Sequence, residues 1–237
     1  MGSFSKPVNR PLPKSISSSP DRSAQSIDAR DPAAPPLTIG IVADTHVPDR
    51  ARALNPQIQD IFKENHVELI LHAGDICNHE VLGSLEKVAP VKAVRGNRDW
   101  FFAPPLPMLY EMNLGGIPIL LLHGHANPIH YISDKIDHTL RGYRFARYEN
   151  FLGENFPQYR VYVFGHSHAA ENRLVDGRLF FNPGSASVPW QKGSLPSVGV
   201  LRIYSDGSVE GKINALKGWR LMNKEWVQAS SSDDRKS

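Results

Sequence analysis

Short apolar runs rich in branched residues alternate with helical patterns in the first half of the chain. Runs of this length that end in polar residues are typical of buried strands. They span residues 37–43, 68–73 and 91–95. Between them, at 58–62 and 81–88, apolar residues recur at i, i+3 and i+4, which predicts amphipathic helices. Strands and helices that alternate at this spacing predict right-handed βαβ units on a parallel sheet.

The pattern changes after residue 106, where turn residues separate short strands. Gly115 and Gly116 lie between two apolar runs, and Asp-Gly pairs occur at 176–177 and 206–207. Both features favour β-hairpins. We predict strands at 108–112, 117–122, 160–164, 172–175, 178–182 and 198–204, and a helix near 131–150. Parallel units followed by hairpins predict an α/β fold in which two mixed β-sheets pack together with helices outside.

Both ends of the chain lack this pattern. Residues 1–37 are rich in Ser and Pro without hydrophobic periodicity, so we expect them to be disordered. They contain no apolar signal sequence, and Lys6 stands where N-myristoylation requires Ser or Thr. Organellar targeting by this segment stays open, although three Asp residues weigh against a transit peptide. We predict one folded domain at 38–217 and a flexible tail at 218–237, in which docking of Trp219 and Trp226 on the core stays open.

Composition narrows the class of protein. The chain has 237 residues, and none of its apolar runs approaches the roughly 18–20 residues that a membrane-spanning helix needs. We therefore expect no membrane span. Cys77 is the single cysteine, which excludes an intramolecular disulfide and a cysteine-type zinc site. This cysteine usage favours a reducing compartment, so we expect the protein in the cytoplasm.

The net charge of +3 lies entirely at the two ends of the chain. Residues 1–36 contribute +2 and residues 218–237 contribute +1, whereas basic and acidic residues balance in between. Binding to a nucleic-acid backbone requires clustered Lys and Arg. We therefore expect no nucleic-acid partner for the central region. The sequence leaves the oligomeric state open.

Polar residues follow directly after five of the predicted strands. In open α/β sheets, ligands bind at the carboxyl ends of the strands, so these side chains are expected at one rim. Several of them are spaced i, i+2, which places two side chains on one face of an extended segment. The residues are Asp44 and His46, Asp75, Asn97–Asp99, His123 and His125, and His166 and His168.

Each of these residues has an ordinary structural interpretation when it is taken alone. An Asp at a strand end is usually a helix cap or a turn residue, and a lone His is more often part of the core or the surface. We interpret the other five histidines in that way, Cys77 as a small buried residue, and Asn182–Ser185 as a loop. The co-occurrence of polar motifs at successive strand ends favours chemistry instead. Such N and O groups can hold two divalent cations, the usual clamp for displacement at phosphorus.

The motifs DTH, GD, GNRD, HGH and GHSH, in this order, resemble those of the calcineurin-like metallophosphoesterase superfamily. With NPGS and the short chain, the similarity is greatest to its small prokaryotic-type phosphodiesterase branch, which also includes the retromer scaffold subunit. The resemblance covers roughly residues 38–205. It implies a four-layer α/β/β/α sandwich, in agreement with the two sheets predicted above.

The resemblance also implies a binuclear metal site. One metal ion would be held by Asp44, His46 and His168, the second by Asn97, His123 and His166, and Asp75 would bridge them. The donors include no sulfur, which suits Mn²⁺, Fe²⁺, Zn²⁺ or Ni²⁺ better than Mg²⁺, and the family similarity favours Mn²⁺.

The expected activity is hydrolysis of a small phosphoester by a metal-dependent phosphoesterase. Two cations lower the pKa of a shared water, and the resulting metal-bound hydroxide attacks phosphorus in line. The resemblance favours phosphodiesters over phosphomonoesters. Asn97 and His125 are expected to contact the phosphate or to orient ligands.

Arg98 departs from the family pattern, because many relatives carry His at this position as the acid for the leaving group. A guanidinium stays charged and cannot be a general acid, but it can bind phosphate or a departing oxyanion. Asp99 could pair with it. We therefore expect turnover to depend steeply on the acidity of the leaving group.

Two other functions compete with the phosphoesterase. A retromer-like protein-interaction scaffold would keep the fold with a vestigial metal site, but all seven implied ligands are present. A metal-dependent nuclease would use the same chemistry on a polymer, and the neutral central region argues against it.

Overall fold

The structure, a computed structural model, describes residues 35–100, 105–124 and 142–229. Its first sheet contains five strands in the order β10-β9-β1-β2-β3. β1, β2 and β3 run parallel to one another, whereas β9 and β10 are antiparallel to their neighbours. The strands are β1 (Leu37–Val42), β2 (Leu69–His72), β3 (Val91–Ala93), β9 (Ser197–Ile203) and β10 (Val209–Ala215). The predicted βαβ units are confirmed.

The second sheet also contains five strands, in the order β4-β5-β6-β8-β7. β5, β6 and β8 are parallel, and hairpins attach β4 to β5 and β7 to β8. The strands are β4 (Leu109–Leu114), β5 (Ile117–Leu122), β6 (Val161–Val163), β7 (Glu171–Val175) and β8 (Arg178–Asn182). The Gly115-Gly116 and Asp176-Gly177 turns lie where the sequence predicted them.

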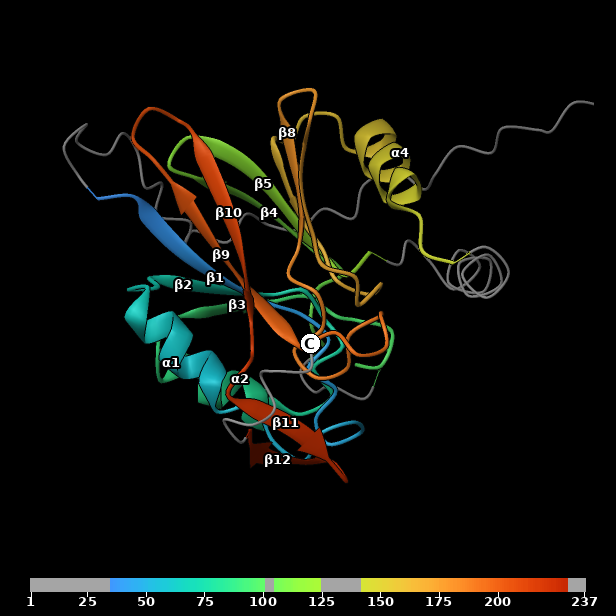
Figure 1. Ribbon diagram of the computed structural model, residues 1–237. Helices are drawn as coiled ribbons and strands as arrows, with labels where there is room; N and C mark the ends of the chain where they lie inside the picture. Colours follow the sequence, from blue (N-terminus) through green and yellow to red (C-terminus); the bar gives the residue numbers. More distant parts are fainter. Residues whose placement is uncertain (1–34, 101–104, 125–141, 230–237) are drawn as a thin grey trace, which may run out of the picture.

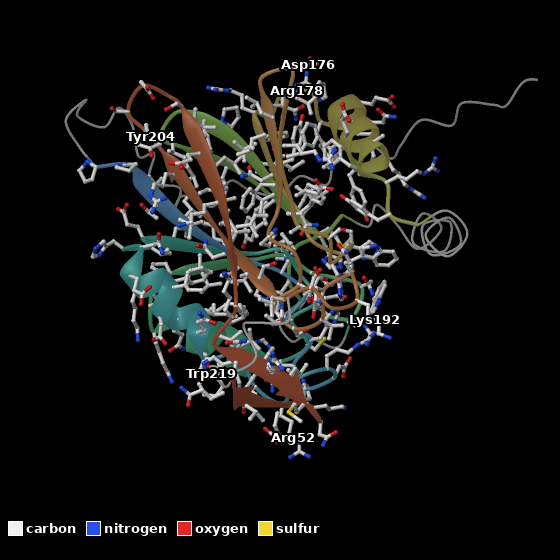
Figure 2. The ribbon with its side chains drawn as sticks, viewed as in Figure 1. Arg52, Asp176, Arg178, Lys192, Tyr204 and Trp219 are labelled. Atoms are coloured by element: carbon white, nitrogen blue, oxygen red, sulfur yellow. The ribbon has the colours of Figure 1, made fainter. Side chains whose placement is uncertain are left out.

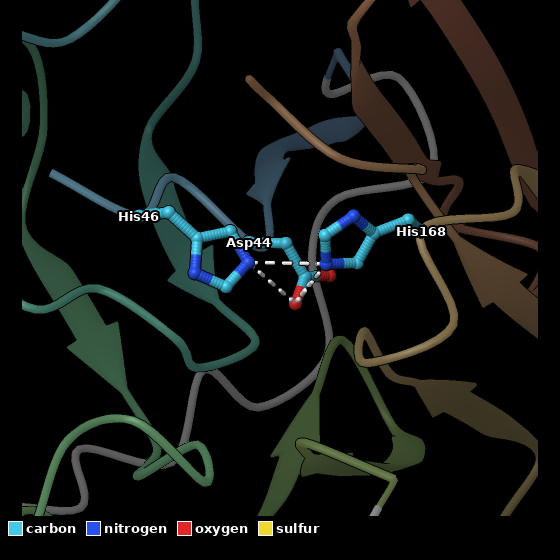
Figure 3. Close-up of side chains that lie close together, drawn as sticks. All are labelled: Asp44, His46 and His168. Atoms are coloured by element: carbon cyan, nitrogen blue, oxygen red, sulfur yellow. Dashed lines mark hydrogen bonds and ion pairs between the residues drawn. The ribbon is translucent and has the colours of Figure 1, made fainter. Parts of the chain in front are cut away.

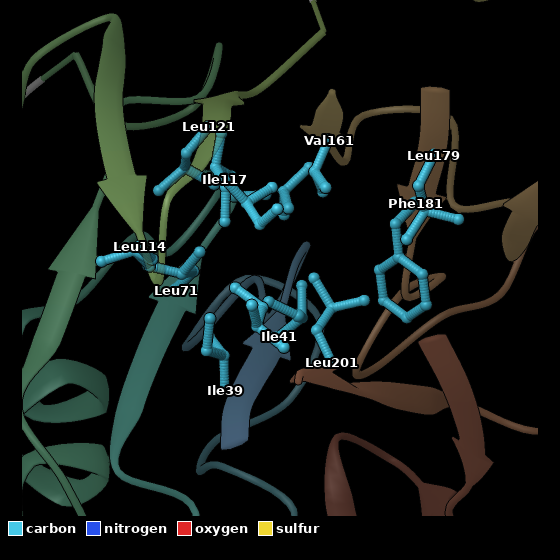
Figure 4. Close-up of a cluster of buried hydrophobic side chains, with 14 of the residues drawn as sticks. Ile39, Ile41, Leu71, Leu114, Ile117, Leu121, Val161, Leu179, Phe181 and Leu201 are labelled. Carbon is cyan, nitrogen blue, oxygen red and sulfur yellow. The ribbon is translucent and has the colours of Figure 1, made fainter. Parts of the chain in front are cut away.

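The main core lies between the two sheets. Alternate side chains of β1, such as Ile39 and Ile41, point into it, and those of β5 and β8, such as Ile117 and Phe181, face them (Figure 4). Their period of two is the spacing of one strand face. Burial of these side chains at about 25 cal/mol per Å² of apolar surface is the main force that joins the sheets.

The outer face of each sheet is covered by helices (Figure 1). The remaining side chains of β1 and β2 pack against α1 (Gln57–Glu64) and α2 (His79–Glu86). Gly40 lies on this face because Phe62 of α1 leaves no room for a side chain there: a Cβ would lie 2.9 Å from the Phe62 ring. On the second sheet, α4 (Phe145–Asn155) packs against β6 and β8. The predicted four-layer α/β/β/α sandwich is confirmed.

The predicted helix near 131–150 is placed differently by the structure. Residues 125–141 lie outside the described residues, Arg144 is extended, and the helix begins at Phe145. The helix follows its apolar stripe of Phe145, Tyr148 and Leu152, which is buried against the second sheet. The predicted helix is therefore confirmed from Phe145 onward, and it ends at Asn155.

The end of the chain is more ordered than predicted. Residues 1–34 and 230–237 lie outside the described residues, but β11 (Trp219–Met222) and β12 (Glu225–Gln228) form a hairpin within the predicted flexible tail. Its turn residues, Asn223 and Lys224, both have positive φ, as a type I′ turn requires. The folded region therefore extends beyond residue 217. Among the described residues, no helix is long and apolar enough to cross a membrane.

Candidate metal centre

The carboxyl ends of the parallel strands of both sheets lie close together at one edge of the sandwich. β1, β2 and β3 lead into the loops with Asp44, Asp75 and Asn97, and β5 and β6 lead into those with His123 and His166. Backbone hydrogen bonds join the loops, for example from Asp44 N to Gly74 O at 3.0 Å. The structure thus brings the seven implied ligands together, and each has a polar side-chain atom within 4 Å of one in another of the seven.

Asp44, His46 and His168 form the first group (Figure 3). The two imidazoles point toward each other with their Nε2 atoms 3.0 Å apart. Asp44 Oδ1 lies 3.8 Å from Nε2 of His46 and 3.5 Å from Nε2 of His168. His168 Nδ1 donates its proton to the carbonyl of Val188, so the Nε2 lone pair of His168 faces the carboxylate. Three donor atoms thus converge on one point.

Asn97, His123 and His166 form the second group. Asn97 Oδ1 lies 3.1 Å from Nε2 of His123 and 3.0 Å from Nδ1 of His166. Nδ1 of His123 is 2.6 Å from the carbonyl of Ala73, which holds the proton on Nδ1 and leaves the Nε2 lone pair toward the site.

Asp75 lies between the two groups. Its Oδ2 is 3.8 Å from Nε2 of His46, and its Oδ1 is 3.4 Å from Nε2 of His123. Gly96 allows this approach, because a Cβ at that position would lie 2.2 Å from both Asp75 N and Asp75 Oδ1. One carboxylate thus presents an oxygen to each group.

The backbone at the centre is held in an uncommon conformation. Of the ten described residues other than glycine with positive φ, five belong to the seven implied ligands: Asp44, His46, Asp75, His166 and His168. Such conformations are costly for residues with a Cβ, and they cluster at functional sites where the surroundings enforce them. The fold therefore expends stability to aim these side chains inward.

Burial keeps the histidines neutral. It lowers the pKa of His46 to about 2, with further lowering by His168 and Arg98, and it lowers the pKa of His123 to about 4. It also lowers the pKa of His168. At neutral pH these imidazoles therefore carry lone pairs, which is the form that binds a metal.

The buried carboxylate of Asp44 tests whether the residues fit a cation. Asp44 is fully buried, and its Oδ1 has no hydrogen-bond partner in the described part of the chain. Burial and the nearby charge of Asp75 raise its pKa well above the usual range. A divalent cation would relieve both costs, because it supplies the missing partner and the opposite charge. The donor set therefore fits a metal ion.

The Asn182–Ser185 segment, which the sequence indicated to be a loop without a functional role, holds the ligand loops in position. The hydroxyls of Ser185 and Ser187 both donate to the carbonyl of Asp44, at 2.9 and 3.0 Å. Asn182 donates to the carbonyl of Gly165 and to the Ser167 hydroxyl, both at 3.0 Å. These residues hold the backbone of the two ligand loops. The NPGS motif was their only trace in the sequence, since their partners are distant along the chain.

Asp99 differs from its predicted role. Its Oδ1 accepts from the amides of Ile76 and Cys77 at 2.9 and 2.8 Å, and its Oδ2 accepts from Gly96 N at 2.8 Å. Because both oxygens are used in this way, Asp99 ties the loop after β3 to the loop after β2. It makes no ion pair with Arg98.

Arg98 points to the outside of the centre. Its Nη1 pairs with Asp49 Oδ2 at 3.0 Å, and both side chains are about half exposed. Its backbone amide donates to Asp75 Oδ1 at 2.8 Å. His125, the last predicted site residue, lies outside the described residues.

His72 lies where the sequence predicted, whereas Cys77 is partly exposed and not fully buried as expected. His72 is buried in the core, where its Nε2 lies 3.2 Å from the Thr45 hydroxyl. Cys77 lies beside the centre, and burial raises the pKa of its thiol to about 12, so it is not a thiolate at neutral pH.

A four-layer sandwich with acidic, amide and imidazole side chains at its strand ends defines a class of metal-dependent phosphoesterases. Residues 37–206 match the calcineurin-like phosphoesterase superfamily domain, and the chain belongs to this family. A protein of Methanothermobacter thermautotrophicus named "Probable metallophosphoesterase" is 34% identical over 167 residues, 70% of this chain and 86% of that protein. A phosphodiesterase of Methanocaldococcus jannaschii is 26% identical over 171 residues, 70% of this chain and 92% of its own.

Solved structures show the same fold. Wild-type Vps29 of Entamoeba histolytica in complex with zinc superposes with a TM-score of 0.53 at 23% identity, and covers 76% of this chain and 99% of its own. At this level of identity the likeness extends to the fold alone.

Proposed function

We propose that this protein is a binuclear metal-dependent phosphoesterase that hydrolyses small phosphodiesters and, less readily, phosphomonoesters. The observation that carries the proposal is the placement of Asp75, whose two carboxylate oxygens face two separate groups of donors. A single ion would need only one of these groups. The family of the chain and the named activity of its relatives support the same reaction class.

The donors divide between two cations in the way the motifs imply. Asp44, His46 and His168 would hold one ion and Asn97, His123 and His166 the other, with Asp75 shared between them. Mn²⁺ is the proposed metal, with Fe²⁺, Zn²⁺ and Ni²⁺ as alternatives, because the donors are nitrogen and oxygen without sulfur. When bound, the pair of ions would activate water and neutralise phosphoryl charge.

The residues of the chain supply positioning and charge. Neutral histidines with fixed Nδ1 protons present lone pairs without prior loss of a proton. Arg98, at the exposed edge, is suited to bind a phosphoryl or leaving-group oxygen but cannot protonate it. Turnover is therefore expected to rise with the acidity of the leaving group. Equal rates for aryl phosphodiesters of different leaving-group pKa would contradict this role.

The proposed partner is a small phosphoester and not a nucleic acid, since the net charge lies at the ends of the chain. A cytoplasmic location stays a prediction from the single cysteine. A retromer-like scaffold with a vestigial site is the alternative. The complete donor set and the orphan oxygen of Asp44 favour the enzyme.

Hydrolysis of bis-p-nitrophenyl phosphate and p-nitrophenyl phosphate by the purified protein tests the proposal. Rates are measured after metal removal with a chelator and after addition of Mn²⁺, for the wild type, Asp75→Asn and His123→Ala. Asp60→Asn is the matched control, because it makes the same chemical change on an exposed face of α1.

We expect metal-dependent turnover that both site variants abolish and the control retains. The ratio of the two wild-type rates then separates a diesterase from a monoesterase. A folded wild-type protein that binds Mn²⁺ but hydrolyses neither ester would contradict the enzyme and favour the scaffold. Stoichiometry of one Mn²⁺ per chain in an active protein would contradict the binuclear site.

A further inference from the structure

The C-terminal hairpin β11–β12 packs against the segment that follows the first metal-binding motif. Figure 2 shows Arg52, from that segment, next to the hairpin, on which Trp219 lies. The hairpin lies beyond residue 206, where the family match ends.

Two hydrogen bonds and an ion pair join the hairpin to this segment, and a third hydrogen bond joins the residue before the hairpin to α1. Arg52 N donates to Lys224 O at 2.8 Å, and Trp226 Nε1 donates to Ala53 O at 2.8 Å. Gly218 N donates to the Gln57 side chain at 2.9 Å. Arg52 Nη1 also pairs with Glu225 Oε1 at 2.8 Å, but both side chains are more than half exposed, so this pair contributes little.

The segment connects the hairpin to the metal centre. It starts at His46, whose carbonyl accepts from Arg50 N at 2.8 Å. Asp49, between them, pairs with Arg98 at 3.0 Å. The hairpin, the segment and the guanidinium at the edge of the centre therefore form one continuous chain of contacts.

The hairpin and the segment depend on each other physically. A two-stranded hairpin is at best marginally stable alone in water, so its order requires the contacts with its neighbour. The segment is exposed at 48–50 and 52–53, and Ala51 is its buried anchor before Asn55. Loss of a hydrogen bond that holds such an exposed segment changes how often the segment departs from its position.

We propose that the β11–β12 hairpin is a positioning element that holds residues 46–55, keeps Asp49 within 3.0 Å of Arg98 and so biases the Arg98 guanidinium toward the edge of the centre for substrate binding. This inference rests on the proposed phosphoesterase function. It assigns substrate affinity, and not the chemical step, to residues beyond the family match.

Trp226→Ala in the full-length protein tests the proposal, with Trp226→Phe as a milder variant that keeps the ring but loses the donor to Ala53. We expect faster hydrogen exchange in residues 46–55 and a KM for bis-p-nitrophenyl phosphate raised about fivefold, while kcat stays within about twofold. Tyr204→Phe is the control, since it loses a hydrogen bond to Glu210 at the far end of the molecule (Figure 2).

A double-mutant cycle asks whether the effect passes through Arg98. In an Arg98→Ala background, Trp226→Ala should no longer change KM, because the group it positions is gone. An equal increase of KM in both backgrounds, or unchanged exchange in Trp226→Ala, would overturn the proposal. An inactive wild type would contradict the phosphoesterase itself. An active wild type with normal KM in Trp226→Ala would contradict this inference alone.

Discussion

The loops after β1 and β3 each bury one carboxylate, and they use it in opposite ways. In the loop after β3, three backbone amides donate to the oxygens of Asp99. In the loop after β1, Oδ1 of Asp44 has no hydrogen-bond partner among the described residues, although the side chain is fully buried. A buried carboxylate is costly unless its oxygens are satisfied.

The difference separates a structural carboxylate from one that is arranged for a ligand. Asp99 stabilises the fold, since it joins loops of neighbouring strands. Asp44 is costly to the metal-free fold, and a bound cation would recover that cost. Both carboxylates are buried in loops that follow parallel strands of the first sheet, and their hydrogen-bond partners distinguish the roles.

Replacement of Asp44 should have the largest effect. Asp44→Asn removes the charge but keeps an acceptor for the His166 amide, so we expect the rate to fall at least about a thousandfold, or about 4 kcal/mol. The metal-free protein should be no less stable, because a buried charge is lost. Thermal unfolding with and without Mn²⁺ checks this: the metal should stabilise the wild type and not the variant. A marked loss of metal-free stability in Asp44→Asn would show that Asp44, like Asp99, has a structural role.

Replacement of Asp99 should show the opposite pattern. Asp99→Ala leaves three backbone donors in the interior without their acceptor, so we expect a loss of about 3 kcal/mol in the free energy of unfolding. Urea denaturation of the metal-free protein measures it. Wild-type stability in Asp99→Ala would show that the Asp99 carboxylate does not stabilise the fold.

The stability of the metal-free protein should also depend on pH, because buried histidines lie in and beside the loop after β1. Burial lowers the pKa of His46 to about 2, of His72 to about 3 and of His123 to about 4. The unfolded chain binds protons at these residues below about pH 6.5, while the folded chain stays neutral there. Their stabilising contribution is therefore complete above that pH and is lost as the pH falls.

We expect each such histidine to add about 1.4 kcal/mol per pH unit to the loss of metal-free stability between pH 6 and 5. Urea denaturation in a chelator at several pH values measures the slope. His72→Asn, which changes a histidine outside the donor set, should reduce the slope by one proton. A slope that His72→Asn leaves unchanged would contradict the neutral, buried state of His72.

Replacement of Arg98 should have the smallest effect, because its side chain lies at the exposed edge and not in the centre. Arg98→Ala is expected to raise KM about tenfold, or about 1.4 kcal/mol, with little change in kcat. Steady-state kinetics with bis-p-nitrophenyl phosphate distinguishes the two constants. A large fall in kcat with unchanged KM would move Arg98 from substrate binding into the chemical step.

Local sequence patterns predicted most of the strands and hairpins of the fold. Period-two alternation in residues such as Ile39 and Ile41, and the glycine turns at 115–116 and 177, specify strands and hairpins through interactions between near neighbours. The start of α4 at Phe145 and the hairpin β11–β12 were not predicted, because both depend on surfaces that distant segments provide.

Local sequence specifies which side chains stand at the ends of the strands, since a motif such as Asp44-Thr45-His46 follows its strand whatever the rest of the chain does. The role of each side chain depends on partners that come from distant parts of the chain. Asp99 accepts from an amide 23 residues away, and Asp44 O accepts from Ser185 at a separation of 141. Such partners are brought together by the packing of two sheets, and a carboxylate acquires its role from the partners that this packing supplies or withholds.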